Sequence, residues 1–126
     1  MMFEYMQAFP RELRSDSLVV VMNDQPLGKA EFLDLLACKL RFPHGSGRNW
    51  DALADCLGDL EWLSTACIRL VFPAIPLRDR ADLATFLTIL SRSRHSLHRI
   101  GVTLQPIFRL ADRLAIEQTT LDEPPK

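Results

Sequence analysis

The side chains best suited to chemistry lie together between residues 43 and 61. This segment carries the acids Asp51, Asp55, Asp59 and Glu61 against one base, Arg48, which leaves a local charge of −3 in a chain whose formal net charge is −1. Because the chain as a whole is nearly neutral, any charged partner must be recognised locally, and we expect no direct binding of nucleic acid. The segment therefore predicts an anionic surface for a cationic partner.

Asp51 and Asp55 are four residues apart, which is about one turn of a helix. On a helix both side chains project from the same face, at a cost in mutual repulsion of about 0.2–0.5 kcal/mol. Two aligned carboxylates can accept charge-assisted hydrogen bonds from Lys, Arg or His side chains. The alternative is structural, because the helix dipole favours an acid in the first turn and Asp55 could simply face solvent.

Three histidines and one serine raise the possibility of an enzyme. His44, His95 and His98 lack the HxH or HExxH spacing of a metal site. Ser46 lies in the sequence Gly-Ser-Gly, but a nucleophile elbow needs a strand before the serine, and here a helix precedes it. Neither a P-loop nor a GxGxxG motif occurs. We therefore expect no catalytic residue, no metal ion and no cofactor.

The cysteines indicate the cellular compartment. Cys38, Cys56 and Cys67 are odd in number, lack CxxC spacing and lie among apolar residues, so we expect buried free thiols and no disulfide framework. No signal peptide is recognisable, and no apolar run approaches the roughly 20 residues of a membrane span. These features predict a cytoplasmic protein without a membrane partner.

The elements that must position the acidic segment follow from hydrophobic periodicity. Compact apolar runs predict strands at residues 18–22, 67–72 and 101–104, and helical spacing predicts helices at residues 29–40, 50–57 and 80–95. Asn49 and Gly58 suit the two ends of the second helix, and residues 41–48 predict an ordered but irregular loop. Pro106 should interrupt the last strand or place it at a sheet edge. Strands separated by helices predict an α/β fold with a small three-stranded parallel sheet packed with helices.

The chain length of 126 residues predicts a single domain. Its core should span about residues 18–108, with an N-terminal extension at 1–17 and a C-terminal extension at 109–126. Both extensions have mixed apolar spacing, so each could pack onto the core or onto a partner. Trp50 and Trp62 are expected to be partly buried packing residues.

The segment LRFPHGSGRNWDALADCL, at residues 40–57, resembles the signature of the barstar family of intracellular ribonuclease inhibitors. The order of predicted elements over roughly residues 18–108 is also similar to that family. The resemblance implies a barstar-like fold whose loop and second helix enter the active-site cleft of a ribonuclease. It also implies that Asp51 and Asp55 are the main anionic anchors, which mimic phosphates of the substrate.

The same resemblance implies further partner-binding residues. Gly47 would let the loop backbone approach the partner, Asn49 would fix the junction of loop and helix, and Trp50 would lie at the edge of the contact. Ser46 and Asp59 complete the predicted binding surface.

Two positions depart from the family pattern, because Gly45 and Ala54 stand where the family has aromatic residues. They favour a target other than barnase. The leading hypothesis is an inhibitor, or an immunity-like protein, of a secreted or toxin-like ribonuclease. The second is an interaction module on the same fold whose partner is not a nuclease. The third is a small enzyme that uses His44 with Asp51 or Asp55.

Overall fold

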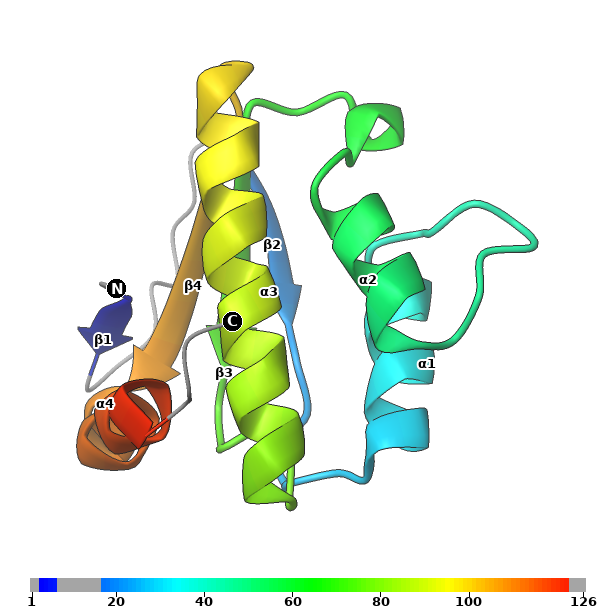
Figure 1. Ribbon diagram of the computed structural model, residues 1–126. Coiled ribbons are helices and arrows are strands. Elements are labelled where there is room, and N and C mark those ends of the chain that lie inside the picture. Colours follow the sequence, from blue (N-terminus) through cyan, green and yellow to red (C-terminus); the bar gives the residue numbers. More distant parts are fainter. Residues whose placement is uncertain (1–2, 7–16, 123–126) are drawn as a thin grey trace.

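A four-stranded parallel sheet forms the centre of the molecule (Figure 1). The computed structural model describes residues 3–6 and 17–122, with side chains as far as residue 119. The strands are β1 (Glu4–Met6), β2 (Ser17–Val21), β3 (Cys67–Phe72) and β4 (Thr103–Arg109). Their order across the sheet is β1-β4-β3-β2, and every neighbouring pair is parallel. The predicted α/β class with a parallel sheet is therefore confirmed.

The described residues also form four helices, α1 (Lys29–Lys39), α2 (Trp50–Leu57), α3 (Arg80–Arg99) and α4 (Arg113–Asp122). Two short 3-10 turns, η1 (Glu61–Leu63) and η2 (Leu110–Asp112), complete the regular structure. Helix α3 runs along the sheet and packs against β4, while α2 and α4 pack against α3 (Figure 1). The long α3 thus connects the sheet to the short helix that carries the acidic residues.

The sheet has four strands where the sequence predicted three. The additional strand, β1, lies beside β4 with Tyr5 opposite Phe108. Phe3 packs against the same residue, with ring centroids 5.4 Å apart. A three-residue strand has too few residues to show an alternating pattern, so its pairing partner is visible only in three dimensions. The part of the N-terminal extension that is described therefore packs onto the core.

Strand β4 continues through Pro106 to Arg109. Of the two possibilities predicted for Pro106, an interrupted strand or an edge position, the interruption is therefore wrong. The Thr103 N–H donates to the Ala66 carbonyl on the β3 side, at 2.8 Å. Because successive residues of a parallel strand face opposite neighbours, the nitrogen of Pro106 faces away from β3. On that side β1 pairs only with residues 107–109, so Pro106 occupies a local edge position where no N–H is needed.

Helix α3 is one turn longer than predicted, since it ends at Arg99 and not at His95. Leu97 is fully buried and continues the apolar face past the predicted end. The helix stops where Gly101 adopts φ +84°, with the Gly101 N–H bound to the His98 carbonyl and the Val102 N–H to the Leu97 carbonyl. This is a Schellman-type end, for which glycine is the preferred residue.

Aromatic rings organise the core between the sheet and the helices. Phe72 of β3 stacks on Phe108 of β4 at 4.7 Å, and Phe86 of α3 meets Phe32 of α1 at 4.7 Å. All four side chains are fully buried. Burial of each such side chain contributes about 1.5–3 kcal/mol, so these four rings stabilise the packing of α1 and α3 against the sheet.

The cysteines correct one expectation. All three are free thiols, but Cys38 is exposed and Cys56 and Cys67 are only half-buried. Cys38 lies near the end of α1, next to Lys39 and opposite the buried face of the helix. Apolar neighbours in the sequence therefore did not imply burial.

Candidate functional site

Helix α2 begins at a well-formed cap. Asn49 has extended backbone (φ −145°), and its side-chain oxygen accepts a hydrogen bond from the Ala52 N–H at 2.7 Å. Gly58 follows the last helical residue. The structure thus confirms the predicted helix at residues 50–57 with its two end residues. A side-chain cap of this kind typically contributes about 1 kcal/mol and fixes the first turn, in which Asp51 lies.

Asp51 and Asp55 are both exposed on α2, whereas Leu53 and Leu57 of the same helix are buried. Neither carboxylate forms an ion pair with another residue in the described part of the chain. Since residues four apart share a helix face, the two carboxylates stand together in solvent. They remain available to bind cationic groups of another molecule.

The loop before α2 is irregular but internally bonded. Gly45 (φ +88°) and Arg41 (φ +56°) adopt left-handed backbone, and the Ser46 hydroxyl donates to the Pro43 carbonyl at 2.7 Å. Arg48 reaches Asp34 of α1 with Nε···Oδ1 of 2.9 Å and also donates to the Ser46 carbonyl. Arg48, the one base in the sequence of the acidic segment, is therefore engaged with Asp34, and neither Asp51 nor Asp55 forms an ion pair with it in the described residues.

Two further contacts hold the loop to the body of the protein. The Cys56 thiol of α2 donates to the Ser46 hydroxyl at 3.6 Å. The Trp62 indole N–H donates to the Leu40 carbonyl at 2.9 Å, and its ring meets Phe42 edge-on at 6.0 Å. Trp62 is half-buried and packs against the core, as predicted, but its hydrogen bond to the start of the loop spans 22 residues and has no signal in the sequence.

The other predicted binding residues occupy different environments. Gly47 is exposed, and a β-carbon there would lie 3.2 Å from Asn49 Nδ2 and 3.4 Å from the Ala52 methyl group. Trp50 is half-buried against the core, with Lys29 Nζ 5.5 Å from its ring centroid. Asp59 is exposed but lies beyond Gly58, outside the helix. The absence of a side chain at Gly47 thus allows tight packing at the helix start. Trp50 packs against the core and is only partly exposed.

His44 belongs to the loop before α2. His44 is exposed, and among the hydrogen bonds of the described residues none joins it to Asp51 or Asp55. Among the residues that the structure describes, no group of three or more His, Cys, Asp or Glu side chains could hold a metal ion. Nor is any helix of the described ranges long and apolar enough to cross a membrane.

These features define a small parallel α/β protein that presents a capped acidic helix and an internally bonded loop to solvent. The family described as "Barstar (barnase inhibitor)" matches residues 17–108, which is more than half of the chain. The chain belongs to the barstar family. No curated protein and no solved structure matches it significantly. Membership agrees with the resemblance of residues 40–57 and explains the order of strands and helices from β2 to β4.

Proposed function

We propose that this chain is an intracellular inhibitor that binds a secreted or toxin-like ribonuclease and blocks its active site with the acidic surface of the loop and α2. The observation that carries the proposal is the exposed pair Asp51 and Asp55 on a short, capped helix. A ribonuclease holds the phosphates of RNA with cationic side chains, and aligned carboxylates can accept the same charge-assisted hydrogen bonds. The inhibitor thereby occupies the substrate's place.

Rigidity of the surface supports the proposal. The cap at Asn49, the ion pair of Arg48 with Asp34 and the hydrogen bond of Trp62 to Leu40 each restrain part of the loop and helix. A surface that is already ordered loses little conformational entropy on binding, which favours high affinity. Gly47, Ser46, Trp50 and Asp59 are proposed to complete the contact around the two aspartates.

The proposal includes a non-enzymatic role in the cytoplasm. The family is described as one of inhibitors, and in the described residues no hydrogen bond links His44 to Asp51 or Asp55. Three free cysteines are typical of a reducing compartment. We propose a single barstar-like domain with its core at about residues 18–108.

Stoichiometric inhibition tests this function. The ribonuclease is first identified as the protein that copurifies with the chain from the native cell extract, and its cleavage of a fluorescent RNA is then measured against increasing chain. We expect activity to fall linearly to zero at one chain per nuclease. Residual full activity with a saturating excess of chain would contradict the proposal.

One observation favours a second function, an interaction module whose partner is not a nuclease. Gly45 and Ala54 are exposed and bear no large side chain, so the surface lacks aromatic anchors at these two positions. Buried aromatic residues often dominate the energy of an interface. If no nuclease copurifies and another protein does so in stoichiometric amount, this second function replaces the first.

A further inference from the structure

An exposed apolar surface lies where η2 leads into α4. Leu114 is 68% exposed and Leu110 is 40% exposed. Single exposed apolar side chains are common in proteins, but these two are four residues apart, and residues at that spacing share one side of a helix. Two exposed alanines continue the same side. We call this surface the α4 patch, and it consists of Leu110, Ala111, Leu114 and Ala115.

The orientation of the α4 patch is set by the other side of the same segment. Asp112, Ile116 and Thr119 are buried, and α4 packs against α3. Arg109 holds Asp112 through two hydrogen bonds, with Nε···Oδ2 of 2.9 Å and Nη2···Oδ1 of 3.0 Å. The patch therefore points away from the core, and turning α4 to bury it would expose the fully buried Ile116.

A hollow of about 340 Å³ adjoins the patch. It is lined by Met6 of β1 together with Arg109, Leu110 and Ala111. Leu114 lies about one turn beyond Leu110 and projects into solvent. The same surface thus offers both a projecting leucine and a hollow with a mainly apolar lining. Anchor side chains that fill pockets of this kind dominate the energy of many interfaces.

The charges around the α4 patch are paired within the chain. Arg109 forms an ion pair with Asp112 at 2.9 Å, and Arg113 forms one with Glu117 at 3.0 Å. The surface is therefore apolar at its centre and neutral at its rim. A strongly acidic or basic partner would gain little electrostatic attraction here, whereas a second copy of the same surface would meet no repulsion.

The patch is built outside the part of the chain that matches the family. The match covers residues 17–108, whereas Met6 precedes this range and the α4 patch follows it. The two flanking segments meet on one surface, at the β1 side of the sheet (Figure 1). Helix α2, which carries Asp51 and Asp55, lies on the other side of α3 (Figure 1). A molecule bound at the α4 patch therefore leaves these two aspartates accessible.

We propose that the α4 patch is the contact surface of a symmetric dimer of this chain. A twofold axis repeats each contact, so Leu114 of one copy enters the hollow beside Met6 and Leu110 of the second copy, and Leu114 of the second copy does the reverse. Because position 114 meets position 110 in both directions, the two α4 helices run antiparallel. Such a contact closes on itself, so assembly stops at two copies and each dimer presents two acidic surfaces.

Sedimentation equilibrium of the whole chain, from about 1 μM to about 1 mM, tests this dimer. We expect the mass to rise with concentration from that of one copy to that of two and no further. The variant Leu114→Gln should raise the dissociation constant of the dimer at least about tenfold, because each dimer loses two apolar anchors. The matched control is Ile100→Gln, since Ile100 is 64% exposed at the end of α3, outside the patch, and this variant should dimerise like the wild type.

The dissociation constant should be nearly the same at about 0.05 M and about 0.5 M salt, since the charges at the rim are paired within each copy. A chain that stays monomeric up to about 1 mM, a mass beyond two copies, or equal dimerisation of Leu114→Gln and the wild type would overturn the proposal. Leu114→Gln should still inhibit the copurified ribonuclease, and Asp55→Ala should still dimerise. The dimer and the inhibitory function can therefore fail separately.

Discussion

At the scale of single residues, the site depends on which acids in and near the acidic segment form ion pairs within the protein. Asp34 is engaged with Arg48, whereas Asp51 and Asp55 have no ionic partner in the described chain. The sequence alone shows the local charge but not which acids are paired. The ion pair between residues 34 and 48 joins helix α1 to the loop, and only the fold brings these two segments together. Exposed ion pairs contribute little to stability, so the role of Arg48 is chiefly to restrain the loop.

The cap residue offers a test at this scale. Asn49→Ala removes the acceptor of the Ala52 N–H and should lower the free energy of unfolding by about 1 kcal/mol, measured by urea denaturation. Asn49→Asp keeps an acceptor at the same place and should be close to wild type. Equal stability of the alanine and wild-type proteins would contradict the capping role.

At the scale of elements, the short strand β1 packs beside β4, although its sequence showed no clear strand pattern. Tyr5 packs near Phe108. Burial raises the pKa of Tyr5 above the ordinary value of 10.0, and the negative charge of Glu117 adds to the rise, while the positive charge of Arg113 lowers the pKa by a smaller amount. The folded state then keeps Tyr5 neutral at a pH where the unfolded chain ionises it. This stabilisation is fully present below about pH 10 and is lost as pH rises through the raised value.

Tyr5 is the only tyrosine of the chain, so its ionisation can be followed by absorbance near 295 nm. We expect the ionisation midpoint of the folded protein to lie above that of the urea-unfolded protein. Coincident midpoints would contradict the docking of β1 against β4. The variant Tyr5→Phe identifies any background from other groups.

Elements with complete local signals were predictable, and the others were not. Residues 50–57 carry a cap, an amphipathic face and a terminal glycine, and residues 67–72 form an uninterrupted apolar run, so both were predicted with the observed bounds. The lengths of α3 and β4 were wrong because Leu97 is buried by tertiary packing and Pro106 is tolerated by a local edge. Ile116 of α4 is fully buried, although its segment showed no clear period.

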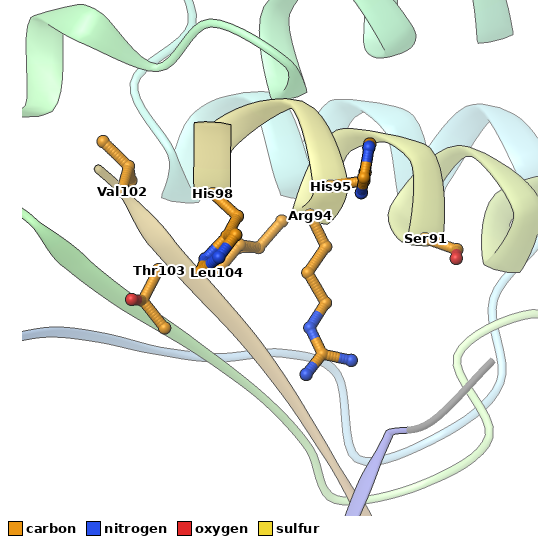
Figure 2. Close-up of a pocket in the computed structure, with 7 residues that line it drawn as sticks. All are labelled: Ser91, Arg94, His95, His98, Val102, Thr103 and Leu104. Carbon is orange, nitrogen blue, oxygen red and sulfur yellow. The ribbon is translucent and has the colours of Figure 1, made fainter. Parts of the chain in front are cut away.

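At the scale of the whole molecule, charge is unevenly distributed in a nearly neutral chain. Helix α2, which carries Asp51 and Asp55, lies on one side of α3 (Figure 1). Arg94, His95 and His98 line a hollow of about 380 Å³ between α3 and the start of β4 (Figure 2). Local fields of this kind steer association even when the net charge is small. The formal charge of −1 therefore says little about how this protein meets a basic partner.

Association kinetics test that steering. The rate of association with the copurified ribonuclease should fall about tenfold or more as salt rises from about 0.01 M to 0.5 M, since interactions beyond about 10 Å are screened already at 0.1 M. The double variant Asp51→Asn with Asp55→Asn should show a weaker dependence. A salt-independent rate in the wild type would remove electrostatic steering from the mechanism.

The affinity of Asp55→Ala for the copurified ribonuclease tests the central claim most directly. Asp55 is exposed, and its carboxylate forms no ion pair in the described part of the chain, so the variant should unfold like the wild type while its dissociation constant rises at least about 30-fold. Asp24→Asn, an exposed acid away from α2, is the matched control and should bind normally. If a folded Asp55→Ala protein binds the nuclease within twofold of wild type, the carboxylates of α2 are not the anchors of the complex.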